Sequence, residues 1–224
     1  MTFSRRIVAV VLAAAVFMVS CRRAEEPRLR TGDLIFVGIP MDYSIDGDSI
    51  EGAITSSTGS PDGLNLIHVA IAEVSADSTW IIDATLSHGV DRHPIDTFFT
   101  DFTLRDGSLP VFIVKRLKNP SKAAGFVDNA KRFLGQAYDL HFMPDNDSLY
   151  CSELVRDSYV LADGTHIFDA APMNFKGPDG EFPLYWKQLF GILGSPIPQD
   201  VPGTNPQSMS ASTALETVPV RLGF

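Results

Sequence analysis

The order of the apolar segments is the feature that most constrains the fold of this chain. Short stretches rich in β-branched and aromatic residues dominate its first half, and longer stretches with helical spacing follow them. Strands that precede helices are typical of an α+β fold, in which an antiparallel sheet packs against helices. The expected strands cover 34–37, 66–72, 79–84 and 109–117; short helices are expected at 49–57 and 94–102, and longer helices at 121–134 and 150–162.

Two of these strands are expected to form a β-hairpin, because the stretch 75–78 between them has turn composition. His68 stands in the first strand where an apolar residue is expected, and Asp83 interrupts the second strand. If the turn holds an even number of residues, both side chains point to the same face of the sheet, opposite or diagonal to one another. A register slip of one residue would separate them. Simple alternation groups Leu66, His68, Ala70 and Ala72 on one face and Ile67, Val69 and Ile71 on the other.

The N-terminus has the layout of a secretory signal. Two arginines precede an apolar run over 7–19, and the small residue Ser20 precedes Cys21. The stretch 18–21, Met-Val-Ser-Cys, resembles the bacterial lipobox, in which the cysteine carries lipid and becomes the mature N-terminus. We therefore expect a lipoprotein signal over 1–20, a charged tether over 21–30, and a protein anchored to a membrane of the bacterial cell envelope. An ordinary cleaved signal peptide and an uncleaved anchor are the alternatives.

The charge of the chain excludes one class of partner. The formal charge is −9, and removal of residues 1–20, which hold two arginines and no acid, makes it −11. Nucleic acid is not expected to bind so anionic a protein. The rest of the chain has the length of one ordinary domain, which we place at 31–194. Residues 195–224 are rich in Pro, Ser, Thr and Gly, and an irregular segment is expected there.

Lipidation of Cys21 would leave Cys151, the second of two cysteines, without a disulfide partner. The polar stretch 145–148 before it can cap a helix, which places Cys151 in the first helical turn. There the positive end of the helix dipole favours a thiolate, and free backbone N–H groups can bind an oxyanion. The alternative is a buried cysteine that packs as a small apolar side chain.

Together, Cys151, His68 and Asp83 offer a nucleophile, a general base and a carboxylate that orients the base. Each also has a purely structural interpretation: His68 as a core histidine bonded to a carbonyl, and Asp83 as a surface residue beside a turn. The remaining histidines are taken as surface or structural residues, and none has zinc-ligand spacing with Cys or Glu, so no metal and no cofactor are expected. These are His88, His93, His141 and His166.

The segments that carry these residues resemble motifs of the NlpC-type papain-like cell-wall amidases. The matching segments are TGDLIF at 31–36, HVAI at 68–71 and IDA at 82–84. In the standard family the segment with the nucleophile comes before these, whereas here YCSELV at 150–155 follows them. The chain therefore resembles the circularly permuted branch, the YiiX/YebB-like group, over roughly residues 31 to 160. Two weaker similarities lie at 49–58 and in the G-x-x-Y-D stretch at 135–139.

The resemblance implies a circularly permuted papain-like fold, with Cys151 as nucleophile, His68 as base and Asp83 as the third polar residue. That third position is often Glu in this branch, and Asp83 is shorter by one methylene. Tyr138 corresponds to a tyrosine that lines the active site of the family. We expect Tyr138 and Tyr150 to contact substrate; the alternative for Tyr138 is an aromatic ring that packs on the core.

Three functions follow as hypotheses. The first is hydrolysis of amide bonds, with cell-wall peptides as the substrates that the resemblance favours. The second keeps the same site but acts on acyl chains, as a lipid amidase or acyltransferase, and Phe98, Phe99 and Phe102 could then line a groove. The third is a lipoprotein that binds a peptide or a glycan without chemistry. The oligomeric state is not predicted.

Overall fold

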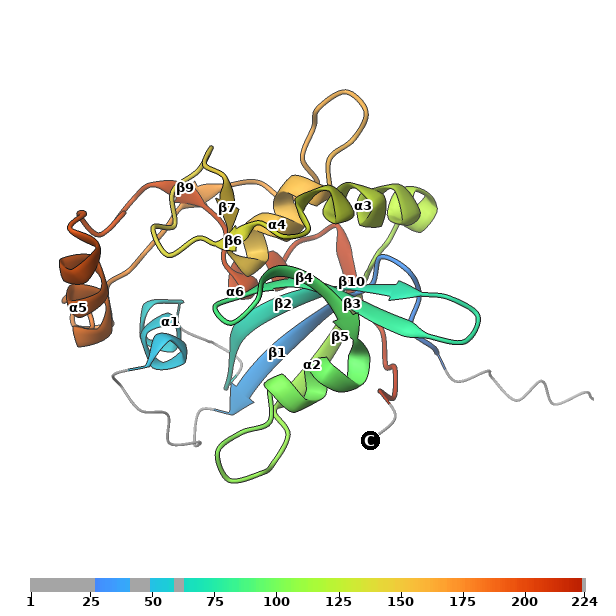
Figure 1. The fold of residues 1–224 in the computed structure, drawn as a ribbon, viewed down its shortest axis with the longest axis horizontal. Helices are drawn as coiled ribbons and strands as arrows, with labels where there is room; N and C mark the ends of the chain where they lie inside the picture. Colours follow the sequence, from blue (N-terminus) through green and yellow to red (C-terminus); the bar gives the residue numbers. More distant parts are fainter. Residues whose placement is uncertain (1–26, 41–48, 59–62, 223–224) are drawn as a thin grey trace, which may run out of the picture.

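The structure is a computed structural model that describes residues 27–40, 49–58 and 63–222 (Figure 1). Its centre is an antiparallel six-stranded sheet with the strand order β10-β5-β1-β2-β3-β4. The α+β class expected from the sequence is confirmed. The strands of this sheet are β1 (Leu34–Pro40), β2 (Leu64–Val74), β3 (Thr79–Thr85), β4 (Gly89–Pro94), β5 (Val111–Leu117) and β10 (Leu215–Thr217).

Helices cover both faces of the sheet (Figure 1). On one face, α3 (Ala123–Ala130) and α4 (Cys151–Ser158) pack against the side chains of Leu34 and Phe36 and their neighbours. On the other face, α2 (Ile95–Asp101) packs against Ile35 and Val37. Alternate residues of β1 therefore enter two different cores, which explains why β1 is buried on both sides.

A third apolar cluster lies away from the sheet, between α1 (Ile50–Thr58) and α5 (Leu184–Leu193). Figure 1 shows these two helices side by side at one end of the molecule. The members of this cluster include Ala53, Phe142, Tyr150, Met173, Phe175, Trp186 and Phe190. Short pairings complete the fold: β6 (Ala137–Tyr138) with β7 (Ser148–Leu149), and β8 (Ala171–Pro172) with β9 (Pro202–Gly203).

The alternation expected along β2 is wrong at its beginning, because the strand contains a β-bulge. Val37 pairs with His68, but the next residue of β1, Gly38, pairs with Leu66, so Ile67 is an extra residue in β2. Leu66 consequently packs in the same core as Val69, and Ile67 lies in the opposite core. Beyond the bulge the expected alternation holds.

The strand β4 was not expected from the sequence. Its stretch, GVDRHP, lacks apolar alternation because Val90 and His93 are its two buried residues, and only Val90 is apolar. Pro94, expected as the first residue of a helix over 94–102, is the N-cap residue of α2, which begins at Ile95.

Two of the expected helices differ from the structure. The helix expected over 121–134 is α3 flanked by two 3₁₀ turns, Pro120–Lys122 and Lys131–Phe133. The helix expected over 150–162 ends at Ser158, where the Tyr159 carbonyl accepts a hydrogen bond from the Ile167 N–H instead of continuing the helix.

The prediction of an irregular C-terminal segment over 195–224 is wrong for two stretches. The helix α6 (Pro206–Ser210) begins at the N-cap Asn205, and β10 pairs with β5 at the edge of the sheet. Met209 and Leu215 enter the main core. A segment rich in Pro, Ser and Thr thus contributes to the domain through a few apolar residues, too sparse to form a recognisable pattern in the sequence.

The expected lipoprotein signal, Cys21 and most of the tether lie outside the described residues. The described part of the tether, 27–30, is held against the body: the Arg28 carbonyl accepts a hydrogen bond from Arg116, and Leu29 packs on the core. Among the described residues, no helix is long and apolar enough to cross a membrane.

A buried ion pair joins the beginning of β1 to β5. The guanidinium of Arg116 donates two hydrogen bonds to Asp33, at 2.6 and 2.7 Å, and the Asp33 side chain is 1% exposed. The Arg30 N–H also donates to this carboxylate. Asp33, the aspartate of the TGDLIF segment, therefore orders the entry to β1.

Replacement of Arg116 by Met should lower the free energy of unfolding by about 3 kcal/mol, because it leaves the Asp33 carboxylate buried without its partner. The matched control is Lys187→Met, which removes an exposed pair with Glu181 and should change stability by less than about 1 kcal/mol. Urea denaturation measures both values. Equal losses in the two variants would contradict the role given to the buried pair.

Candidate active site

Cys151 is the first residue of α4, as expected, and Tyr150 is the N-cap residue with extended backbone dihedrals. The first helical hydrogen bond runs from the Leu154 N–H to the Tyr150 carbonyl. The N–H groups of the first turn therefore point out of the helix beside the Cys151 sulfur. Cys151 is a free thiol and largely buried, but its side chain lines a pocket that opens to solvent.

The structure brings His68 and Asp83 together. The His68 Nε2 lies 2.8 Å from Asp83 Oδ2, and both side chains are buried. In the β2–β3 hairpin Ile71 pairs with Ile82, so the next pair in this register sets Asp83 across from Ala70. Asp83 is thus the diagonal neighbour of His68 on the same face, one of the two geometries that the sequence allowed.

His93 also belongs to this cluster, and no feature of the sequence predicted its place beside Asp83. It pairs with Ile81 in the β3–β4 ladder, and its Nε2 lies 3.0 Å from Asp83 Oδ1. Asp83 therefore bonds one histidine with each of its oxygens. No motif marks His93, and β4, its strand, has no pattern that predicts a strand; His93 is a buried structural residue, not a surface one.

Charge and hydrogen bonding decide the protonation of this cluster. Burial alone would lower the pKa of His68, but the negative charge of Cys151 and hydrogen bonds with Asp83 and Cys151 outweigh it and raise the pKa to about 10. Burial alone would raise the pKa of Asp83, but hydrogen bonds from His68 and His93 lower it to about 2. At neutral pH the site therefore holds a protonated imidazole paired with the ionised carboxylate of Asp83, with the Cys151 side chain beside it.

Aromatic rings fix the orientation of the imidazole on its other side. The Phe102 ring centroid lies 4.6 Å from that of His68, and the Phe98 centroid lies 6.2 Å away. Of the three phenylalanines expected to line a groove, Phe102 lines a hollow beside His68, Phe98 is fully buried, and Phe99 packs on the core around Ile35 and Val37.

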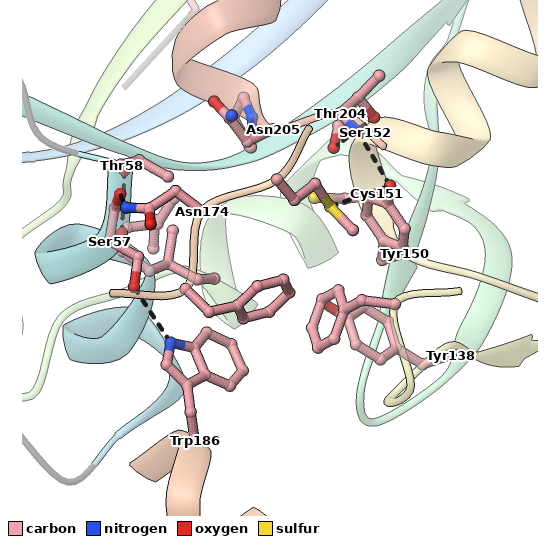
Figure 2. Close-up of a pocket in the computed structure, with 16 residues that line it drawn as sticks. Ser57, Thr58, Tyr138, Tyr150, Cys151, Ser152, Asn174, Trp186, Thr204 and Asn205 are labelled. Atoms are coloured by element: carbon pink, nitrogen blue, oxygen red, sulfur yellow. Dashed lines mark hydrogen bonds between the residues drawn. The ribbon is translucent and has the colours of Figure 1, made fainter. Parts of the chain in front are cut away.

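Tyr138 and Tyr150 both line the pocket beside Cys151 (Figure 2). Tyr138 also lines the hollow beside His68, so it stands between the two spaces. Burial, together with the negative charge of Cys151, raises the pKa of Tyr138 well above its usual value, which keeps its hydroxyl protonated.

The hydroxyl of Tyr150, in contrast, is used within the protein. It accepts a hydrogen bond from the Thr204 N–H at 3.0 Å and donates to the sulfur of Met173. The Thr204 hydroxyl in turn donates to Ser152. Tyr150 therefore contributes its ring to the pocket wall, while its hydroxyl ties the segment after β9 to the start of α4.

Glu153 is a second residue that the sequence analysis left without a role. It stands at the third position of α4, where its carboxyl accepts the N–H of the N-cap residue Tyr150. Burial and the nearby carboxylates of Asp157 and Asp139 raise the pKa of Glu153 to about 8. The glutamate of YCSELV thus fixes the first turn of the helix that carries Cys151.

The other histidines lie apart from this site. His88 and His141 are exposed, and His166 bonds the Arg156 carbonyl. Within the described ranges 27–40, 49–58 and 63–222, no group of three or more His, Cys, Asp or Glu side chains is arranged to hold a metal ion.

Comparison with known proteins shows similarity to one protein family and to a solved structure. The model of the permuted papain-like amidase family (YaeF/YiiX, C92) matches residues 28–219. Among solved structures, the chain is similar to the crystal structure of the metalloprotein YiiX from Escherichia coli O157:H7, with a TM-score of 0.65 and 24% sequence identity. The similarity covers 87% of this chain and 98% of that one. No match is found among the curated proteins.

Replacement of Asp83 by Asn should lower the pKa of His68, because the protonated imidazole loses its buried anion while the side chain keeps its size. His68, protonated up to about pH 10 in the native protein, should then lose its proton at lower pH. Titration of the imidazole C–H signals by NMR measures the change. Asp96→Asn, on the exposed side of α2, is the control that should leave the titration unchanged. An unaltered pKa in Asp83→Asn would contradict the electrostatic account of the site.

Proposed function

Because the chain belongs to the permuted papain-like amidase family, a family of cysteine amidases and peptidases, we propose that it hydrolyses an amide bond through a thioester on Cys151. The observation that carries this proposal is the arrangement of Cys151, protonated His68 and ionised Asp83 in one buried cluster. A thiolate paired with an imidazolium is the resting state of an activated cysteine nucleophile.

In the first half of the reaction, the Cys151 thiolate attacks the carbonyl carbon of the substrate and forms a carbon–sulfur bond. As the carbon–nitrogen bond breaks, His68 gives its proton to the leaving amine. In the second half, neutral His68 takes a proton from water, and the resulting hydroxide forms a bond to the thioester carbon. The carbon–sulfur bond then breaks, the acid leaves, and the thiolate and imidazolium are restored. Asp83 holds the imidazole and stabilises its charged form throughout.

The oxyanion formed at each attack needs hydrogen-bond donors near the sulfur. The N–H groups of the first turn of α4 meet this need, since Cys151 itself begins the helix. We propose the Tyr138 hydroxyl as a further donor or a contact to the substrate, because it lies in the wall of both spaces and stays protonated.

The family relation allows two substrate classes: peptide amides of the cell wall and amides of acyl chains. We propose that either is met at a membrane of the cell envelope, with Cys21 carrying the lipid anchor. This part of the proposal rests on the sequence of residues 1–21, which lie outside the described residues.

Replacement of Cys151 by Ala should abolish amide hydrolysis, because no other group in the cluster can form the thioester. The expected loss is at least a thousandfold in kcat, with an unfolding free energy within about 1 kcal/mol of the native protein. Steady-state hydrolysis of simple amide substrates and urea denaturation are the measurements. Turnover retained in Cys151→Ala would remove the proposed mechanism.

Replacement of Cys21 by Ala tests the lipid anchor and serves as the matched cysteine control. If the lipid anchor is correct, this variant should move from the membrane fraction to the soluble fraction and lose incorporated palmitate, while its turnover stays at the native level. Cell fractionation with labelled palmitate gives the answer. A native protein that takes up no label would contradict the anchor and leave the proposed amidase activity untouched.

A further inference from the structure

The pocket beside Cys151 has walls in which apolar and aromatic side chains predominate, with no charged side chain among the described lining residues. Figure 2 shows rings and aliphatic side chains around an open space, with Thr58 at one side and Cys151 at the other. The cavity is about 60 Å³ and opens to solvent. Its apolar lining includes Ile54, Ile67, Phe142, Met173, Phe175 and Trp186.

The rings of these walls brace one another in edge-to-face contacts. The ring centroids of Phe142 and Trp186 are 5.5 Å apart, and those of Phe175 and Trp186 are 5.1 Å apart. Such contacts hold the rings in fixed orientations. The pocket is therefore preformed, with a shape set by the cluster between α1 and α5.

Most polar side chains in the walls already have partners within the protein. The Trp186 Nε1–H donates to the Ser57 hydroxyl, and the Thr58 hydroxyl donates to the Ile54 carbonyl. The amide of Asn174 donates to the carbonyls of Ser57 and Lys176. These groups are not available to hydrogen-bond the backbone of a peptide in the pocket.

The charges around the pocket also disfavour a peptide with free carboxylates. Among the described residues that line this pocket, none is a lysine or an arginine. The hollow beside His68 is lined by two acids, Glu51 and Asp101, and its described lining holds no lysine or arginine. The one cation there is protonated His68, and it is already paired with Asp83. A substrate with free carboxylates, such as the acidic peptides of a cell wall, would therefore find no unpaired cation in either space and would meet two acids in the second.

We propose that this pocket binds the acyl side of the scissile amide and that the substrate carries an uncharged aliphatic acyl chain there. The inference deepens the proposed function and rests on it: the carbonyl carbon attacked by Cys151 bears the chain. Burial of the chain against the aromatic walls supplies affinity, and the lack of cations excludes acidic acyl groups.

The test is a series of amides with one fluorogenic amine and acyl groups from acetyl to decanoyl, compared with the γ-glutamyl amide. We expect kcat/KM to rise roughly fourfold per added methylene until the pocket is full, the factor that corresponds to about 0.8 kcal/mol per buried CH₂. The γ-glutamyl amide should be a poorer substrate than the butyryl amide. A flat series, or a preference for γ-glutamyl, would overturn the proposal while the Cys151-dependent amidase activity stands.

A variant pair links the preference to this pocket. Thr58→Trp places a large ring in the space, and the ratio of kcat/KM for decanoyl over acetyl should fall at least tenfold. Ser56→Trp is the matched control, since Ser56 is exposed on the same helix and does not line the pocket; its ratio should equal that of the native protein. Circular dichroism melts of both variants confirm folding. An unchanged ratio in folded Thr58→Trp would overturn the proposal.

Binding to Cys151→Ala separates failure of this inference from failure of the proposed function, because it needs no turnover. Decanamide should bind this variant at least tenfold more tightly than glutamine, the primary amide of the γ-glutamyl group, as measured by calorimetry. If decanamide binds but the native protein hydrolyses no amide, the pocket is confirmed and the amidase is contradicted. If glutamine binds equally well or better, the acyl pocket is contradicted.

Discussion

The diagonal contact between His68 and Asp83 depends on the register of one hairpin, and the rest of the site is arranged around it. A shift of one residue between β2 and β3 would send the two side chains to opposite faces. In the observed register the carboxylate meets two imidazoles, one from β2 and one from β4. Three neighbouring strands thus share one buried anion, and the pKa of His68 is raised by Cys151 and by its hydrogen bond with that anion.

The bulge in β2 connects this hairpin to the C-terminal third of the chain. It changes the face of Leu66, whose N–H donates to the side chain of Gln207 on α6 at 3.0 Å. The same segment reaches α4 through the hydrogen bonds of Thr204 with Tyr150 and Ser152. Residues beyond 200 therefore join the strand of the base to the helix of the nucleophile, although they carry no catalytic group.

The sequence predicts the parts of the site that have strong local signals. The hairpin, the place of Cys151 at the start of a helix, and the side shared by His68 and Asp83 all follow from local composition and alternation. The bulge, β4 and β10 do not, because edge strands need few apolar residues and a bulge leaves no mark in the sequence. The place of His93 beside Asp83 is not predictable either, because this contact depends on the pairing of β3 with β4 and not on a spacing along the chain.

The order in which the strands and the cysteine helix follow one another along the chain matters less to this site than the pairing of the strands. An antiparallel sheet keeps the same neighbours when the chain is cut and rejoined elsewhere, so a cysteine helix that follows the histidine strand can reach the position it would have if it came first. The pocket walls, unlike the catalytic cluster, do not depend on the pairing of the strands. Phe142, Phe175 and Trp186 come from segments between and after the motifs, braced by one another rather than by the sheet. Such walls can change without disturbing the cluster at Cys151, which separates the chemistry of the family from the choice of its substrates.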